Sequence, residues 1–319
     1  MNPRYLLFLL FPVLAQSQSL NNLAATFSIV AHDPSTGEFG VGVQSHWFSV
    51  GQVVPWAEAG VGAVATQSFV EVSYGPKGLD LMKRGRTAKQ ALEELLAKDS
   101  LASVRQVAMI DAEGNAAAHT GTDCISFAGQ KTGKNYSCQG NLLASPRVWE
   151  EMARAFENTI GPLAERILAA LDAGQAAGGD ARGRQSAALV VVKKVSESEP
   201  WKNRIVDLRV EDSDYPLKEL SRVYNLHRAY DWANKGDEYF ALKEYDNALK
   251  AYDTALGIVP ENDELMFWKG SMEMMMGKSD EAVSDVQRAV NLNPRWRILL
   301  ERLPDSVFPQ AQWIVKQLR

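Results

Sequence analysis

Residues 26–45 read TFSIVAHDPSTGEFGVGVQS, and the architecture of the first half of the chain follows from this stretch. Thr26–His32 and Phe39–Ser45 are short runs rich in residues that favour β-strands. The turn-forming residues 33–37, which include a proline and a glycine, separate the two runs. The stretch therefore predicts a β-hairpin at the start of an antiparallel sheet.

The pattern around this hairpin mixes strands and helices up to about residue 212. We expect further strands over 61–67, 104–111, 115–120, 136–142, 186–194 and 204–210, and helices over 78–84, 87–98, 146–158 and 162–173. Hairpins dominate, and the helices fall in pairs between groups of strands, which indicates antiparallel sheets covered by helices. The expected fold class of this half is α+β, a sandwich whose topology the pattern alone does not specify.

The residues before Thr26 have the pattern of a secretory signal followed by a spacer. A basic residue precedes the short apolar run 5–14, and residues 13–15 fit a cleavage site, so residues 1–15 are an expected signal peptide. The alternative is an uncleaved membrane anchor, although a span needs roughly 20 apolar residues. Residues 16–25 would be a spacer or pro-segment. The mature protein is expected to be exported, periplasmic or extracellular, without stable membrane insertion.

Composition and charge narrow the class of function. The 319-residue chain has mixed charges and a net charge of −5, which argues against a nucleic-acid binder, because such proteins carry a basic stripe. The pair Cys124 and Cys138 suggests a disulfide in an exported protein, and two free thiols are the alternative. Neither this pair nor the spacing of His32, His46 and His119 matches a known set of metal ligands. We therefore expect no metal or other cofactor.

The second half of the chain is helical and contains an internal repeat. Four small or proline residues return after about 34 residues, the period of tetratricopeptide repeats: Gly236 and Gly270, Ala248 and Ala282, Ala255 and Ala289, Pro260 and Pro294. The first unit also has Trp232, Tyr239 and Tyr252 at aromatic positions of that repeat. This half resembles the tetratricopeptide family. The small residues would let the helices of each unit approach closely.

This resemblance implies an all-α domain over residues 216–319. Its repeat units would cover about 229–262 and 263–296, and a last helix over 309–318 would cap the stack. Arrays of this kind bind peptides or proteins in a groove. The partner is left open between a protein, a peptide and a second copy of the chain, which would make a homo-oligomer. The alternative to a repeat domain is a plain helical bundle with accidental spacing.

Several segments of the first half are richer in polar residues and glycine than a scaffold needs. They are A-T-Q-S at 65–68, H-T-G at 119–121, Q-G-N at 139–141 and G-G-D-A-R-G-R-Q-S-A-A-L at 178–189. Together with residues 26–45, they resemble the Ntn-hydrolase-like family known as domain of unknown function 1028. The resemblance extends to about residue 224. It implies a four-layer αββα sandwich over residues 26–215, beside the N-terminal-nucleophile hydrolases.

The resemblance makes Thr26 the candidate nucleophile for cleaving an amide bond in a small amide or peptide substrate, with its own α-amine as the base. Backbone N–H groups or the Asn141 amide would stabilise the oxyanion. Asp33, Asp180 and Arg182 would orient the amine or bind a substrate carboxylate. The same segments supply further candidates: Ser45 and His119 for catalysis, Gln139 and Gln185 for substrate binding.

This chemistry needs a second proteolytic cut, because signal cleavage would leave the amine of Gln16 and not that of Thr26. Each candidate also has a structural alternative: Thr26 as the first residue of a strand, Ser45 as the end of one, His119 as a hydrogen-bonded strand residue, Asn141 as a turn residue, Arg182 as the partner of Asp180. The alternative function is a catalytically silent sandwich that binds a ligand or a protein, with the repeats as its docking surface.

Overall fold

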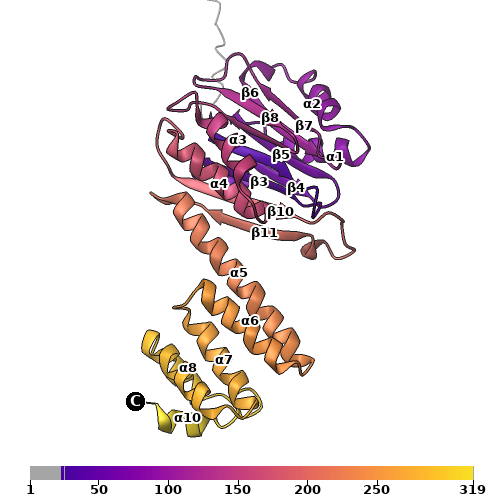
Figure 1. Ribbon diagram of the computed structural model, residues 1–319. Helices are drawn as coiled ribbons and strands as arrows, with labels where there is room; N and C mark the ends of the chain where they lie inside the picture. The colour runs from indigo at the N-terminus through magenta and orange to yellow at the C-terminus, as the bar shows by residue number, and fades with distance from the viewer. Residues whose placement is uncertain (1–22, 25, 319) are drawn as a thin grey trace, which may run out of the picture. The chain divides into compact units, whose positions relative to one another are not determined.

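The computed structural model describes residues 23–24 and 26–318 of the chain. The expected signal peptide, residues 1–15, lies outside the described residues, as does most of the expected spacer, residues 16–25. The chain divides into two compact units, the first ending at Asp214 and the second beginning at Tyr215. Figure 1 shows strands and helices in the first unit and helices in the second.

Two antiparallel sheets form the middle of the first unit. Within the described residues, the first sheet has five strands in the order β1-β5-β6-β7, with β4 also paired to β5: β1 (Leu23–Ala24), β4 (Pro55–Glu58), β5 (Gly62–Phe69), β6 (Arg105–Asp111) and β7 (Ala116–Thr120). The second sheet has six strands in the order β11-β10-β3-β2-β9-β8: β2 (Thr26–His32), β3 (Phe39–Ser45), β8 (Gly129–Gly133), β9 (Tyr136–Gly140), β10 (Ser186–Val192) and β11 (Arg204–Val210).

Helices cover the outer face of each sheet (Figure 1). The first sheet carries α1 (Tyr74–Lys83) and α2 (Ala88–Leu96), and the second carries α3 (Val148–Asn158) and α4 (Leu163–Ala176). The inner faces of the sheets pack on each other, so the order of layers is helix, sheet, sheet, helix. The expected α+β class is confirmed, and the order of layers is the expected αββα.

The hairpin of residues 26–45 forms as predicted, with β2 and β3 paired antiparallel. Successive side chains of β3 point to opposite faces of the sheet, which explains how the layers pack. Val41 and Val43 belong to the apolar cluster between the sheets, whereas Gly42, between them, faces α4. A Cβ atom on Gly42 would lie 2.3 Å from Cγ2 of Ile167. Only glycine at this position therefore lets the helix approach the strand so closely.

The sequence pattern misses the strands β1, β4 and β8. β8 reads G-Q-K-T-G and has no apolar residue, while β4 begins with a proline. Each of these strands pairs with one neighbour only. Edge strands are short and need no run of buried residues, so they leave little trace in hydrophobic alternation.

The disulfide prediction is wrong, because both cysteines are free. Cys138 is fully buried in β9, opposite Ile29, on the face of the second sheet that the helices cover. Cys124 lies in the loop after β7, and its thiol donates a hydrogen bond to the carbonyl oxygen of Arg105 in the first sheet at 3.4 Å. The two thiols thus belong to different layers and cannot bond without movement of the backbone.

In the described part of the chain, the second unit contains helices and no strands. They are α5 (Pro216–Ala241), α6 (Tyr245–Ile258), α7 (Asp263–Met275), α8 (Ser279–Leu292), α9 (Arg295–Leu300) and α10 (Ala311–Gln317). α5 packs on α6 and α7 on α8, as two helical hairpins. Of the helices in residues 26–318, none combines the length and the apolar character needed to cross a bilayer.

The repeated glycines have the same role in each hairpin. A Cβ atom on Gly236 would lie 2.6 Å from the ring of Tyr252, and one on Gly270 would lie 2.7 Å from the side chain of Val286. The predicted close approach of the helices is therefore confirmed in both units. α10 packs onto the second hairpin through Ile314 and its neighbours.

Candidate functional site

One end of the sandwich collects the segments that the sequence analysis singled out. β2 begins there with Thr26, beside Ser45 at the end of β3. Residues 178–185 lead into β10 at the same end of the strands of the second sheet. In the first sheet, residues 65–68 lie in β5, and 119–121 include the end of β7. We call this region the motif end of the sandwich.

Thr26 is fully buried at the motif end. Its Oγ1 donates a hydrogen bond to Oγ of Ser45 at 3.1 Å. Its carbonyl oxygen accepts from the backbone N–H of Asn141 at 3.0 Å and from Nε2 of Gln67 at 3.3 Å. Groups from β3, β5 and the end of β9 therefore hold this residue, and the two sheets meet at it.

Buried amides and hydroxyls fill the space between the sheets next to Thr26. Nε2 of Gln67 donates to Oε1 of Gln106 at 2.7 Å, and Oγ of Ser28 donates to Oε1 of Gln67 at 2.6 Å. Gln139, a predicted substrate-binding residue, is fully buried and donates to Oγ of Ser28 at 2.6 Å. Its amide is therefore part of the interior in this structure. We call these side chains, with Asn141, the amide network.

Gln106 is the centre of the amide network, and the sequence analysis did not single it out. Its Nε2 donates to the carbonyl oxygen of Gly140 at 2.8 Å and to Oγ1 of Thr120 at 2.9 Å. Its Oε1 accepts from Gln67 and from Asn141. The signal that could have found it is alternation, because Gln106 shares the inward-facing positions of β6 with the apolar Ala108 and Ile110.

The Asn141 side chain lies next to Thr26 with its donor already engaged. Nδ2 of Asn141 donates to Oε1 of Gln106 at 2.9 Å, so in this structure the donor proposed for the oxyanion serves the amide network. The other end of the amide differs. Oδ1 is buried and has no hydrogen-bond partner among the residues that the structure describes.

Asp180 and Arg182 form an ion pair in the loop before β10. Arg182 donates from Nε to Oδ1 at 3.2 Å and from a terminal nitrogen to Oδ2 at 2.9 Å. The Asp180 carboxylate, which is fully buried, also accepts from the backbone N–H of His46 at 2.9 Å. This carboxylate ties the loop at 178–185 to the loop that follows β3.

Asp33 does not lie at the motif end. It follows β2 at its far end, roughly 23 Å from Thr26 at a rise of about 3.3 Å per residue. Burial alone would raise the pKa of its carboxyl, but hydrogen bonds from Ser35 and the charge of Arg166 lower the pKa below its ordinary value. Asp33 therefore acts as a turn residue here, and the structure does not bring it to Thr26.

His119 and Gln185 lie near the motif end but point elsewhere. Thr120 faces the amide network, so the preceding residue faces the other side of the sheet, where Nε2 of His119 is 2.8 Å from the carbonyl oxygen of Ala102. The side chain of Gln185 donates to Oδ1 of Asp212 at 3.0 Å. The structure thus separates these two candidates from Thr26.

Leu23 and Ala24, shortly before Thr26, belong to the first sheet. β1 pairs with the end of β5, with Leu23 opposite Phe69 and Ala24 opposite Ser68. β4 pairs with the earlier part of β5, so β1 continues the same edge. The backbone of Leu23 and Ala24 is therefore held at the motif end.

Strained backbone also occurs at the motif end. Ser49, Ser68 and Leu142 have positive φ angles of 56°, 71° and 51°. A left-handed conformation costs a residue with a side chain on the order of 1 kcal/mol or more, and such residues cluster at functional sites. Two loops and the end of β5 thus carry a feature that a plain scaffold does not need.

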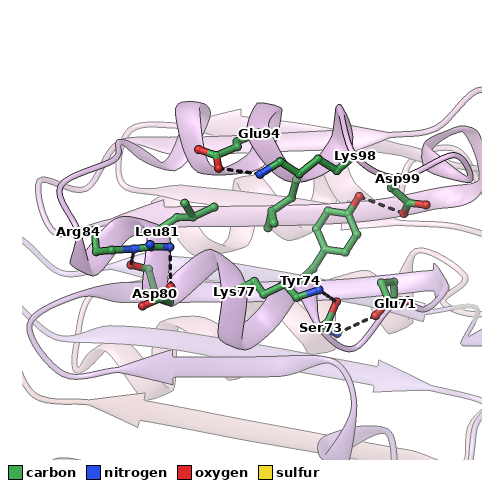
Figure 2. A pocket seen from close by; sticks show the side chains of 11 residues that line it. Glu71, Ser73, Tyr74, Lys77, Asp80, Leu81, Arg84, Glu94, Lys98 and Asp99 are labelled. Carbon is green, nitrogen blue, oxygen red and sulfur yellow. Dashed lines mark hydrogen bonds and ion pairs between the residues drawn. The ribbon is translucent and has the colours of Figure 1, made fainter.

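A groove between α1 and α2 contains none of the predicted site residues (Figure 2). Its polar side chains are bonded to one another, as Lys98 is to Glu94 at 3.0 Å and Tyr74 is to Asp99 at 3.1 Å. These pairs lie on an outer face of the sandwich, under none of the motif segments. The chemistry that the sequence suggests lies at the motif end instead.

Comparison with known families divides the chain in the same way. A model described as a family of unknown function, DUF1028, matches residues 26–220, and a tetratricopeptide repeat model matches residues 232–262. The chain is also similar to the crystal structure of protein SPO2555 from Silicibacter pomeroyi, a DUF1028 protein. That similarity has a TM-score of 0.57 and 32% identity, and it covers 63% of this chain and 85% of that one.

Two curated proteins match over short stretches. The chain is 29% identical over 72 residues to the protein STIP1 homolog of Dictyostelium discoideum, and 33% identical over 91 residues to protein bimA of Emericella nidulans. These stretches cover 23% and 28% of this chain, but 13% and 11% of the relatives. The family model, in contrast, accounts for more than half of the chain. The chain therefore belongs to the DUF1028 family, and it continues into a tetratricopeptide repeat.

Proposed function

We propose that the chain is an exported hydrolase that cleaves an amide bond in a small amide or peptide, with Thr26 as its nucleophile. The observation that carries the proposal is the position of the Thr26 hydroxyl. It donates a hydrogen bond to Oγ of Ser45 at 3.1 Å, at the end of the sandwich where the motif segments of both sheets meet. The signal-like residues 1–15 support the export.

The reaction uses a chain that begins at Thr26. Oγ1 attacks the carbonyl carbon of the amide, and the hydroxyl proton passes to the α-amine of the same residue. The C–N bond breaks, the leaving amine takes that proton, and the acyl group stays on Oγ1 as an ester. Water then hydrolyses the ester to a carboxylic acid and restores the hydroxyl. Ser45, within hydrogen-bond distance of Oγ1, orients the nucleophile.

The intact chain is the inactive precursor in this scheme. While the bond between Ala25 and Thr26 is uncut, the nitrogen of Thr26 belongs to a peptide group and cannot act as a base. The backbone pairing of β1 with β5 keeps the preceding residues beside Thr26. Cleavage removes only the two-residue strand β1 from the described elements, so the released chain keeps both compact units.

Cys124 is a rival nucleophile at the motif end. Burial raises the pKa of its thiol above the ordinary value. The thiolate is the reactive form of cysteine, and a thiol of raised pKa stays protonated at neutral pH. This favours the Thr26 hydroxyl, which needs only the neighbouring amine.

The proposal can be tested with a β-lactone, a strained cyclic ester whose ring opens as it acylates a nucleophilic threonine. Expression of a chain that starts Met-Thr26 lets removal of the methionine expose Thr26. We expect one acyl group on the N-terminal peptide by mass spectrometry, retained in Thr26→Ser and lost in Thr26→Ala. The chain that keeps residues 1–25 should not react. A folded released chain without the adduct, or equal labelling of Thr26→Ala, would contradict the proposal.

The burial of Thr26 favours a second candidate function. If the preceding residues stay attached, the sandwich is a silent binding module and has no free amine. In both candidates we propose that the tetratricopeptide repeat binds a protein or peptide partner. The two are separated by the β-lactone, because a silent module stays unlabelled even when its chain begins at Thr26.

A further inference from the structure

Oδ1 of Asn141 is a buried atom at the motif end without a hydrogen-bond partner among the described residues, as are Oγ of Ser49 and Oγ of Ser68, and among these three it belongs to the residue opposite Thr26. Buried polar atoms in proteins are normally paired, so this one needs a reason. We propose that Oδ1 of Asn141 is the acceptor that positions the α-amine of Thr26 once the chain begins there. The inference rests on the proposed function, because it assigns a positioning residue to the same site.

Backbone carbonyls fix the orientation of the Asn141 amide. Nε2 of Gln106 donates to the carbonyl oxygens of Gly140 at 2.8 Å and Gly129 at 3.2 Å, and a carbonyl oxygen can only accept. Oε1 of Gln106 must therefore face Asn141, 2.9 Å away, and it requires a donor there. That donor is Nδ2, which leaves Oδ1 as the unpaired end of the side chain.

Asn141 and Thr26 are opposed across neighbouring segments. Phe27 of β2 pairs with Gly140 of β9, so Thr26 and Asn141 occupy the next opposed positions. Opposed residues have Cβ atoms about 5 Å apart. The N–H of Asn141 donates to the carbonyl oxygen of Thr26 at 3.0 Å, which holds the two backbones together. A freed amine on Thr26 is thus within reach of the Asn141 side chain.

An acceptor at this position would do two things for a catalytic base. It takes one N–H of the amine, which turns the nitrogen lone pair toward the hydroxyl of Thr26. It also stabilises the ammonium group that forms when the amine takes the hydroxyl proton. A hydrogen bond to the charged form raises the pKa of the amine. Ser45 holds Oγ1 from the other neighbouring strand, so hydroxyl and amine are fixed from two sides.

Three residues that form hydrogen bonds with Thr26 have uncharged side chains: Ser45, Gln67 and Asn141. The ionisable groups of the motif end include the ion pairs of Asp180 with Arg182 and Asp99 with Arg105, together with His46, His119, Arg184 and Cys124. These groups are the same in every variant compared below. A change in the pKa of the amine therefore reports on residue 141.

The test measures the pKa of the Thr26 α-amine in the chain whose initiator methionine has been removed. The readout is the rate of N-terminal acetylation by acetic anhydride as a function of pH, followed by mass spectrometry. Asn141→Leu removes the acceptor and should lower the pKa by about 1 unit, whereas Asn141→Asp keeps an acceptor, adds a charge and should raise it by about 1 unit. The matched control is Gln44→Leu, a fully buried amide on the helix-covered face of β3, which should leave the pKa unchanged.

An amine pKa that is the same in wild type and in folded Asn141→Leu would overturn the inference. If that variant fails to fold, Asn141→Asp decides, since an unchanged pKa there has the same meaning. The outcome is separate from catalysis. If the amine pKa changes with residue 141 but the β-lactone does not label Thr26, the contact is supported and the proposed hydrolase function is contradicted. If the β-lactone labels Thr26 but the amine pKa does not depend on residue 141, the hydrolase function is supported and the contact is contradicted.

Discussion

The space between the two sheets is filled in two different ways. Away from Thr26, aliphatic side chains such as Val41, Val43 and Ile110 form an apolar cluster. At the motif end, the amide network occupies the same space. Gln67 and Gln106 form hydrogen bonds with residues of both sheets, and Gln139 forms them within the second sheet. One sandwich thus has an apolar half and a polar half of its interior.

The two halves of the interior have different roles: one stabilises the fold, and the other fixes the position of particular side chains. Apolar burial is non-directional and roughly proportional to area, so that half tolerates substitutions that conserve volume. Buried amides are directional, and each lost partner leaves an unpaired group in a medium of low polarity. We infer that the apolar half supplies stability, while the amide network holds Thr26 in one place.

Gln106→Leu should break the polar half and has the largest expected effect. It leaves the donors of Gln67 and Asn141, and the carbonyl oxygen of Gly140, without this partner in the interior. At about 1–3 kcal/mol for each buried unpaired group, partly relieved by rearrangement, we expect a loss of about 3–5 kcal/mol in the free energy of unfolding. Urea denaturation followed by circular dichroism measures it. A loss under about 1 kcal/mol would mean that the network is not cooperative.

Glu273 in α7 extends the comparison to a buried group that can carry charge. Burial, together with the nearby Asp285, raises its pKa from 4.5 to about 7, although Lys269 at 3.3 Å opposes this shift. A carboxyl whose pKa is raised by folding stabilises the protein below its unfolded pKa and loses that contribution as the pH rises through the folded pKa. The second unit should therefore lose about 3 kcal/mol of stability between pH 4.5 and pH 8.

The matched variant is Glu273→Gln, which cannot titrate. Its thermal midpoint should change less with pH over that range than the wild-type midpoint, and it should be the more stable protein at pH 8. Parallel pH profiles for the two proteins would show that the carboxyl stays ionised throughout.

Val41→Thr introduces a polar group into the apolar half. The two side chains have nearly the same shape, but the new hydroxyl would be fully buried among aliphatic groups with no acceptor in the described cluster. We expect a loss of about 1.5 kcal/mol in the free energy of unfolding. A neutral result in the same urea assay would indicate that water reaches this half of the interior.

Gln44→Leu should stabilise the protein, by the smallest of these amounts. Gln44 is fully buried, and neither its oxygen nor its nitrogen has a hydrogen-bond partner among the described residues. Replacing the amide with an apolar group of similar volume removes the desolvation penalty, and we expect a gain of about 1 kcal/mol. A loss of stability would show that the amide has a partner such as a bound water.

Alternation and turn chemistry were enough to predict β2, β3 and the helical repeats. They could not predict that residues 26–45 reach both ends of the sandwich, and so Asp33 was grouped with Thr26 although it lies at the far end of β2. Alternation marks Gln106 as a polar residue on an apolar face of its strand, but its place at the centre of a buried network is evident only when its partners are known. Those partners come from strands that are distant in the sequence.

The central claim is that Thr26 becomes the first residue of the mature chain. Expression of residues 1–319 and intact mass spectrometry of the exported protein test this claim most directly. The account predicts a major form whose mass corresponds to residues 26–319. A mature protein that begins at Gln16, with no form that begins at Thr26, would contradict it.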